Sequence, residues 1–196
     1  MGKTAIIILA AGNSSRLGSP KQLLQFHGKT LIARLVEQAR LATPAVLVVT
    51  GSQSDEIVAE VQDDQVIPIN NVHWESGMGS SIRIGTQNAL ERFSDLEQVI
   101  LAVCDQPFVT ASVFSALLAK AALSPQNIVA CSYSETVGTP VLFKQKYFPH
   151  LVQFDGHFGA KKLIEEHSQD LVMVPFPQGE IDLDTIDDYE SLIRKL

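Results

Sequence analysis

The sequence predicts an α/β protein built on a doubly wound, mostly parallel sheet, and three observations favour this fold class. Short apolar runs alternate along the chain with segments of helical periodicity, which is typical of parallel strands joined by crossover helices. The runs are almost continuously apolar, as expected of strands buried on both faces. No internal repeat and no linker-like stretch interrupts the 196 residues, so we expect a single domain over residues 1–196.

Each expected element rests on one of two local patterns. The apolar runs place strands at residues 5–9, 45–50, 66–69, 98–103, 127–131, 139–143 and 170–174. Helical spacing of apolar residues places helices at 31–41, 55–61, 80–92, 110–122, 159–167 and 186–196. In open α/β sheets ligands bind at the carboxyl ends of the strands, so the polar residues that follow each strand are the functional candidates.

Composition excludes several classes of function. The net charge of −7 and the absence of a Lys/Arg-rich run argue against nucleic-acid binding, so local cations and a metal must hold any phosphorylated ligand. No apolar stretch approaches the ~18 residues of a membrane span, and the N-terminal apolar run lacks a signal-peptide cleavage site. Cys104 and Cys131 each lie at or near an apolar run, which is typical of reduced structural thiols. We therefore expect a cytoplasmic protein that binds neither nucleic acid nor membrane.

The loop after the first strand is the most informative segment. It contains small residues around Gly12 and two cations, Arg16 and Lys21. Backbone N–H groups in such a loop can approach a polyphosphate, and the cations can neutralise it. Ser14 breaks the Rossmann fingerprint, and no Lys-Ser/Thr pair follows Gly18 as a Walker loop requires. A nucleotide site of another kind is the hypothesis, and a plain strand-to-helix loop with solvated cations is the alternative.

Carboxylates stand where a metal could bind beside this loop. Asp105 follows the strand at 98–103, which places it at the same edge of the sheet. It suits Mg²⁺, which takes one or two carboxylates plus phosphate oxygens, although aspartate is also common in caps and turns. Near the C-terminus, Asp187 and Asp188 suit a helix N-terminus, with a variant capping box between Thr185 and Asp188. Two further carboxylates precede that cap, so Asp184 or Asp182 is the expected partner of Asp105.

Three other segments are weaker candidates. Residues 75–82 contain two glycines and three serines at the start of a helix, and their backbone N–H groups could contact base, ribose or phosphate. Residues 137–143 and 155–161 lie where a second substrate could enter, and a lone His157 is more often an exposed loop residue than a catalyst. Trp74 is either packing or a stacking surface.

Together these motifs resemble the nucleotidyltransferase family that contains molybdopterin cytidylyltransferase and molybdopterin-guanine dinucleotide synthase, and the cytidylyltransferase branch is the closer one. The matching segments run in the family's order at 9–12 with Arg16, 20–21, 77–81, 104–107, 138–140 and 182–185. The resemblance implies a Rossmann-like nucleotidyltransferase fold. It also implies Mg²⁺-dependent transfer of a nucleoside monophosphate from a nucleoside triphosphate to a phosphorylated small-molecule acceptor, with release of pyrophosphate. Ala11, where the guanylyl branch tends to have glycine, favours CTP. Molybdopterin is then the expected acceptor, with delivery of the product to a molybdoenzyme as a further possibility.

The resemblance also implies a role for each matching residue. Arg16, Lys21 and Asp105 would be catalytic, and Asp105 with Asp184 would hold Mg²⁺. The nucleotide-binding residues would be Leu9, Ala10, Ala11, Gly12, Arg16, Lys21, Ser76, Gly77, Ser80 and Ser81. The acceptor-binding residues would be Gly138, Thr139, Pro140, Gly156, His157 and Lys161.

One departure from the family concerns the acceptor. The family's acceptor-side motif is usually Gly-Asp-x-Gly-Ala-Arg, whereas this chain has Gly156-His-Phe-Gly-Ala-Lys161. Imidazole replaces a carboxylate there, and lysine cannot reproduce the two-pronged hydrogen bonding of arginine. A sugar- or alditol-phosphate nucleotidyltransferase is therefore the alternative among enzymes, and a non-catalytic nucleotide-binding module is the alternative from another class. The retained Lys21 and Asp105 argue against the module.

Overall fold

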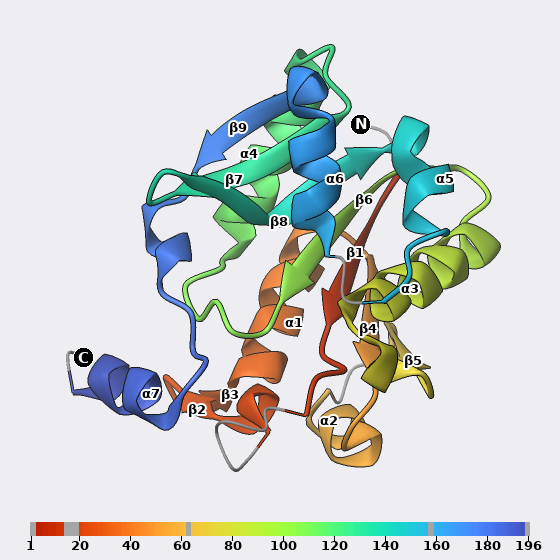
Figure 1. The fold of residues 1–196 in the computed structure, drawn as a ribbon. Coiled ribbons are helices and arrows are strands. Elements are labelled where there is room, and N and C mark those ends of the chain that lie inside the picture. The colour runs from red at the N-terminus through yellow and green to blue at the C-terminus, as the bar shows by residue number, and fades with distance from the viewer. Residues whose placement is uncertain (1–2, 14–19, 62–63, 157–158, 195–196) are drawn as a thin grey trace.

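A computed structural model describes residues 3–13, 20–61, 64–156 and 159–194. Its centre is a seven-stranded sheet in the order β5-β4-β1-β6-β8-β7-β9 (Figure 1). The strands are β1 Lys3–Leu9, β4 Ala45–Thr50, β5 Val66–Asn70, β6 Leu96–Val103, β7 Ile128–Tyr133, β8 Thr136–Lys144 and β9 Leu171–Pro175. β1 pairs in parallel with β4 and β6, and β8 is antiparallel to both β6 and β7. The prediction of a doubly wound, mostly parallel α/β sheet is confirmed.

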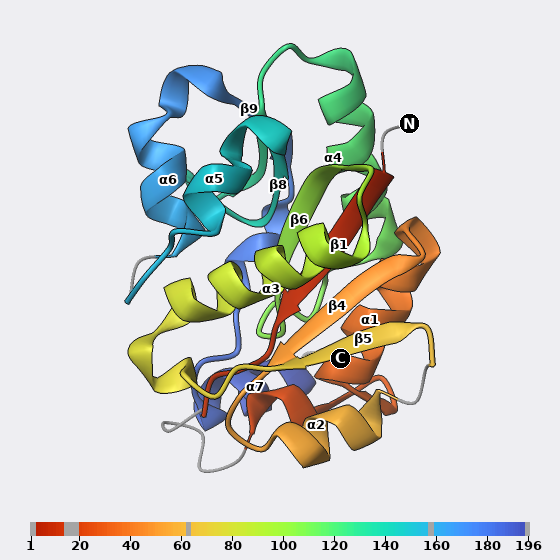
Figure 2. The ribbon, with the colours of Figure 1, turned by 90° about the vertical axis from the view of Figure 1, so that its right-hand side faces the viewer.

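Helices cover both faces of the sheet (Figure 2). They are α1 Leu31–Ala42, α2 Ser54–Glu60, α3 Met78–Arg92, α4 Ala111–Leu123, α5 Phe148–Leu151, α6 Ala160–Glu166 and α7 Ile186–Ile193. Side chains of β1 alternate between the faces: Ile6 and Ile8 pack with α1 and α4, and Ala5 and Ile7 pack with α3 and α6. This alternation buries residues 4–8 of the strand on both faces, which explains the apolar run.

Two of the turns were not expected from the sequence. A short hairpin of β2 Gln25–Phe26 and β3 Lys29–Thr30 turns at His27 and Gly28, both with positive φ. Helix α7 lies beside this hairpin (Figure 1), and a small apolar cluster of Phe26, Leu31, Leu183 and Leu192 joins them. β8 begins at Thr136 because the β7–β8 hairpin turns within two residues, Ser134 and Glu135, at φ 41° and 59°.

The sheet topology determines where a ligand can bind. β4 and β6 lie on opposite sides of β1, so the chain changes direction at β1. At such a switch point the segments after neighbouring strands leave toward opposite faces and open a crevice at the carboxyl edge. The segments that follow β1 and β6 therefore border this crevice. In the described part of the chain, no helix has the length and apolar character needed to cross a bilayer.

Candidate active site

Three charged side chains that are distant in sequence meet at the carboxyl edge. The Lys21 Nζ atom lies 2.7 Å from Asp105 Oδ2 and 3.1 Å from Asp184 Oδ1. Lys21 begins a 3₁₀ turn after the β1 loop, Asp105 follows β6, and Asp184 precedes α7. Lys21 and Asp105 keep only 20% and 22% of their side-chain surface exposed, and Asp184 keeps 41%. The two carboxylates thus converge on one cationic group.

Backbone and apolar anchors hold Asp184 in this position. The Leu183 amide donates to the Asp105 carbonyl over 2.9 Å, and the Leu183 side chain is fully buried in the cluster under α7. On the other side of Asp184, Thr185 caps α7 in a capping box with Asp188, as the sequence indicated. Asp184 therefore lies between two anchored residues, which limits how far its carboxylate can move from Asp105.

The electrostatics of this centre favour cations. Burial alone would lower the pKa of Lys21, but attraction and hydrogen bonds from Asp105 and Asp184 outweigh it and raise that pKa. The pKa of Asp182 is raised by burial and by the negative charges of Asp184 and Asp105. Carboxylates therefore outnumber the ammonium group here, and the local field attracts further positive charge.

The carboxylate pair fits a divalent metal that is shared with a substrate. Asp105 and Asp184 already have one cationic group between them, and carboxylate oxygens are hard ligands. Within the described residues, no set of three or more His, Cys, Asp or Glu side chains forms a complete protein cage. Mg²⁺ commonly binds through one or two carboxylates with water and phosphate oxygens, which is the chemistry that this pair offers.

The β1 loop is held by a residue that the sequence analysis missed. Gln22 is buried, and its Nε2 donates to the carbonyls of Ala10 (2.8 Å) and Gly12 (2.9 Å). Ala10 and Ala11 are also buried, so the backbone at the end of β1 is held tightly. In the sequence, Gln22 stands next to the candidate residue Lys21. Its neighbours along the chain, however, give no indication that its side chain is buried. Arg16, the second expected cation, lies outside the described residues.

The serines at the start of α3 form hydrogen bonds with other residues of the protein. Asn71 Nδ2 donates to Ser80 Oγ (2.8 Å) and Ser81 Oγ (3.0 Å), and both serines are buried. Ser76 donates to the carbonyl of His73. Gly77 adopts φ 109°, a conformation that a side chain would strain. These contacts give the serines a supporting role in the turn, and nucleotide contact by Ser76, Gly77, Ser80 and Ser81 stays a prediction.

Trp74 packs against Gly51, which directly follows β4 and also lies close to the Ala11 carbonyl. A Cβ atom on Gly51 would lie 2.6 Å from the Trp74 Cβ and Cγ atoms and 2.8 Å from the Ala11 carbonyl oxygen. Gly51 therefore allows the indole to approach the strand end closely. This placement gives Trp74 a packing role beside Ala11 and leaves its half-buried ring near the expected nucleotide segment.

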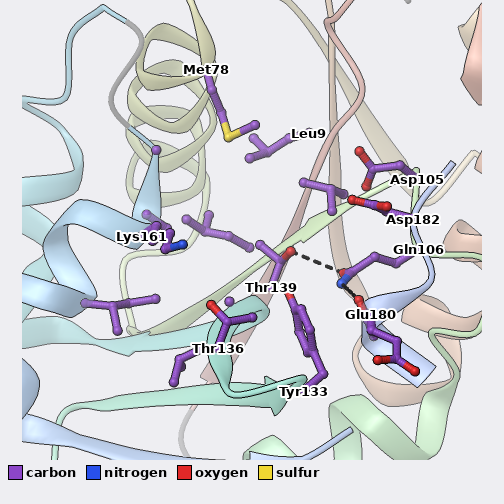
Figure 3. A pocket seen from close by; sticks show the side chains of 18 of the residues that line it. Leu9, Met78, Asp105, Gln106, Tyr133, Thr136, Thr139, Lys161, Glu180 and Asp182 are labelled. Carbon is purple, nitrogen blue, oxygen red and sulfur yellow. Dashed lines mark hydrogen bonds between the residues drawn. The ribbon is translucent and has the colours of Figure 1, made fainter. Parts of the chain in front are cut away.

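A cavity of about 320 Å³ adjoins the carboxylates (Figure 3). One part of its wall is apolar, with Leu9, Met78 and Ile164. The rest is polar, and Lys161 lies across the cavity from Asp105 and Asp182 (Figure 3). The other polar lining side chains are Gln106, Tyr133, Thr136, Thr139 and Glu180. A ligand in this cavity would therefore touch both an apolar surface and charged groups.

The expected acceptor residues are distributed around this cavity unevenly. Gly138, Thr139 and Lys161 line it. Pro140 is buried within β8, and Gly156 lines a neighbouring hollow instead. His157 lies outside the described residues. Sequence reasoning assigned no role to Tyr133 or Glu180, because neither belongs to a motif with recognisable spacing.

The fold and the arrangement at its switch point are those of a nucleotide-binding α/β protein. The chain belongs to the MobA-like NTP transferase domain family, whose model matches residues 6–171. It is therefore a nucleotidyltransferase of that family.

Two curated relatives match part of the chain. Nicotine blue oxidoreductase of Paenarthrobacter nicotinovorans is 30% identical over 138 residues, which is 69% of this chain and 65% of that protein. A probable molybdenum cofactor guanylyltransferase of Bacillus cereus (strain Q1) is 31% identical over 118 residues, which is 60% of this chain and 56% of that protein. The matches thus span less than two thirds of the length of each of these two relatives.

Solved structures are similar over nearly the whole chain. An Rv0371c homologue from Mycobacterium sp. strain JC1 has a TM-score of 0.79 at 29% identity, covering 98% of this chain and 96% of that one. Rv0371c of Mycobacterium tuberculosis H37Rv, in complex with manganese, has a TM-score of 0.78 at 23% identity, covering 99% of this chain and 100% of that one. The second likeness extends to the fold alone.

Proposed function

We propose that this nucleotidyltransferase moves CMP from CTP to the phosphate group of molybdopterin and releases pyrophosphate in a Mg²⁺-dependent reaction. The whole chain, residues 1–196, would act as one domain. The observation that carries the proposal is the convergence of Asp105 and Asp184 on Lys21 beside a cavity that can take a second substrate.

The donor half of the reaction would use the β1 loop and the charged centre. The backbone of residues 9–12 would hold base and ribose, and Arg16 with Lys21 would bind the triphosphate. Asp105 and Asp184 would hold the metal, which supplies charge neutralisation at the phosphates. The manganese in the Rv0371c structure supports a divalent cation in this role. The preference for CTP rests on Ala11, which is buried at the end of β1 beside Trp74.

The transfer itself needs positioning more than proton removal. An ionised oxygen of the acceptor phosphate forms a bond to the α-phosphorus of CTP, and the bond from that phosphorus to the pyrophosphate oxygen breaks. Because the attacking oxygen already carries its charge, no general base is required. Lys21 and Arg16 would stabilise the negative charge that gathers on the departing pyrophosphate.

The cavity supports an acceptor that combines a flat ring with a phosphate. Leu9, Met78 and Ile164 offer an apolar wall for a heterocycle, and Lys161 offers a cation for phosphate. A volume of about 320 Å³ is suited to a small molecule. Thr136, Tyr133 and Glu180 also supply the hydroxyl and carboxylate partners that a sugar phosphate would use, so this acceptor class belongs in the test.

Cysteine chemistry supports a reducing compartment and gives the thiols no part in the reaction. Cys104 and Cys131 are buried and free. Burial raises the pKa of Cys131 to about 12, and burial with the charge of Asp105 raises the pKa of Cys104. We therefore place the reaction in the cytoplasm, where its product would be passed to a molybdoenzyme.

The deciding experiment measures pyrophosphate release from CTP, GTP, ATP and UTP with Mg²⁺. Each nucleotide is supplied alone, with molybdopterin and with a panel of sugar phosphates, and an Asp105→Asn variant serves as the control. We expect release only with CTP and molybdopterin together. Faster release with GTP contradicts the base assignment, and release only with sugar phosphates contradicts the acceptor. Tight nucleotide binding without turnover on any acceptor indicates a non-catalytic module.

A further inference from the structure

Gln106 links three segments of the chain at the edge of the candidate site. Its side chain is buried although it directly follows Asp105. The Gln106 Nε2 atom donates to the Gly179 carbonyl over 3.0 Å, and Oε1 accepts from Thr139 Oγ1 over 3.2 Å (Figure 3). One amide thus joins the end of β6 to β8 and to the 3₁₀ turn Pro177–Glu180.

Tyr133 packs against the two segments that this amide joins. A Cβ atom at Gly179 would lie 2.6 Å from the Tyr133 Cδ1 atom, and a Cβ at Gly138 would collide with the Tyr133 hydroxyl. The tyrosine ring therefore fills the space that the two glycines leave, and it packs β8 and the Pro177–Glu180 turn together beside Gln106.

The link controls where the second carboxylate lies. The segment that carries Asp184 is attached to the end of β6 at two points. The first is the bond from Gln106 to the Gly179 carbonyl, and the second is the bond from the Leu183 amide to the Asp105 carbonyl. Without the first attachment, the segment before Leu183 would lose its side-chain connection to β6, and the separation of Asp105 and Asp184 would be less well defined.

We propose that Gln106 is a positioning residue that sets the separation of Asp105 and Asp184, and through it the affinity of this pair for a divalent cation. The inference rests on the proposed function, which assigns the pair to the metal. An amide suits the task because it donates and accepts without adding charge beside the carboxylates. A glutamate at this position would direct a carboxylate oxygen at the Gly179 carbonyl, where the structure has a donor.

The test measures Mn²⁺ binding without nucleotide, by calorimetry and by electron paramagnetic resonance, in the whole protein. Gln106→Leu removes both hydrogen bonds, and we expect Mn²⁺ affinity to fall roughly 10–100-fold. The matched control is Gln98→Leu, because Gln98 is buried at the opposite end of β6, where it donates to Thr4 Oγ1 over 2.8 Å. We expect the control to bind Mn²⁺ within about twofold of wild type, since distant sites act independently.

A second pair of variants covers the case in which Gln106→Leu does not fold. Thr139→Val keeps the shape of the side chain but removes the donor to Gln106, and Thr139→Ser keeps the hydroxyl. We expect weaker Mn²⁺ binding in the first and near wild-type binding in the second. A purely structural role would lower the melting temperature of Gln106→Leu and Gln98→Leu alike and leave the Mn²⁺ affinity of both unchanged.

The outcomes separate the two proposals. Wild-type Mn²⁺ affinity in folded Gln106→Leu or Thr139→Val overturns the role of Gln106 and leaves the proposed function standing. An equal loss of affinity in Gln98→Leu overturns it as well, because the effect would then follow general destabilisation. The titrations are repeated with CTP present, because Lys21 opposes metal binding in its absence. If wild-type protein binds no Mn²⁺ under either condition, the metal assignment in the proposed function fails, and the inference fails with it.

Discussion

Lys21 contacts both acids of the candidate site, so its charge has two effects that experiments can separate. In the structure its ammonium compensates Asp105 and Asp184 at 2.7 and 3.1 Å. A divalent cation bound between the same carboxylates would be repelled by that ammonium. In the proposed reaction the triphosphate offers Lys21 another anionic partner. We therefore expect Lys21 to weaken metal binding without nucleotide and to be required for turnover with it.

Lys21→Ala tests both effects. Turnover should fall about a hundredfold or more, because a charge-neutralising group is lost from the site. Mn²⁺ affinity without nucleotide should rise, because the competing ammonium is gone. Pyrophosphate release measures the first effect and titration calorimetry the second.

Two further variants serve as comparisons for Lys21→Ala. Lys29→Ala is the matched control, since Lys29 pairs with Glu37 at an exposed position, and it should change neither quantity. Asp105→Ala should lose turnover to a similar degree and also lose Mn²⁺ binding. A loss of turnover below about threefold in Lys21→Ala or Asp105→Ala would remove that residue from the mechanism.

At the scale of elements, Asp170 connects the strands at the edge away from the site. It accepts from the Asn127 amide (2.9 Å), from Lys146 Nζ (2.7 Å) and from the Tyr147 hydroxyl (3.0 Å). These bonds tie the start of β9 to the segments before β7 and after β8. Burial would raise the pKa of Asp170, but hydrogen bonds from Lys146 and Asn127 outweigh it and lower the pKa to about 2.

Asp170→Asn should therefore destabilise the protein in a pH-dependent way. At pH 7 we expect the free energy of unfolding to fall by about 2 kcal/mol, since hydrogen bonds to a charged group are lost. Because the folded pKa is below the unfolded value, this stability is present above pH ~4 and disappears as the pH falls towards ~2. Urea denaturation of wild type and variant at pH 7 and at pH ~3 measures the difference.

An exposed ion pair provides the control for that measurement. Asp95 pairs with Lys3 at 2.8 Å, and 70% of its side chain is exposed. Asp95→Asn should lower the free energy of unfolding much less than Asp170→Asn does, as is usual for surface pairs. If the cost of Asp170→Asn is as large at pH ~3 as at pH 7, the loss comes from altered packing, and the charge of Asp170 is not its cause.

Most helices and strands could be predicted from the sequence, and those that were missed share a physical cause. The seven strands of the main sheet and six helices lie close to where local apolar patterns place them. The hairpin of β2 and β3 and the four-residue α5 were missed. Elements this short complete no period of apolar residues, so tertiary contacts alone stabilise them. The β7–β8 turn could not be recognised from the sequence either, since neither Ser134 nor Glu135 is glycine or asparagine.

At the scale of the whole molecule, the net charge of −7 opposes anionic ligands, so nucleotide affinity must come from local cations and a metal. A ligand that binds only the folded state stabilises the entire chain, so global unfolding reports on this site. The proposed function therefore predicts a metal-dependent effect of CTP on the melting temperature.

We expect CTP with Mg²⁺, at about 100 times its dissociation constant, to stabilise the fold by about 2.7 kcal/mol. For a chain of this size that corresponds to a rise of roughly 5–11 °C in melting temperature. GTP at the same concentration should give a smaller rise, and EDTA should abolish the effect of CTP. Differential scanning calorimetry measures the shift, with Asp105→Asn as the variant that should not respond. An equal shift for all four nucleotides would argue against base recognition at Ala11.

The sequence by itself determined the alternation of strands and helices, the β1 loop and the acids that follow strands, because each depends on neighbours along the chain. Only the tertiary structure decided which of these residues meet. Lys21 lies 84 residues from Asp105 and 163 from Asp184, and their contact depends on strand order and on the buried Leu183. The supporting roles of Gln22 and Gln106 were likewise found only in the structure. Burial and hydrogen-bond partners depend on tertiary packing, and no local sequence pattern indicates them.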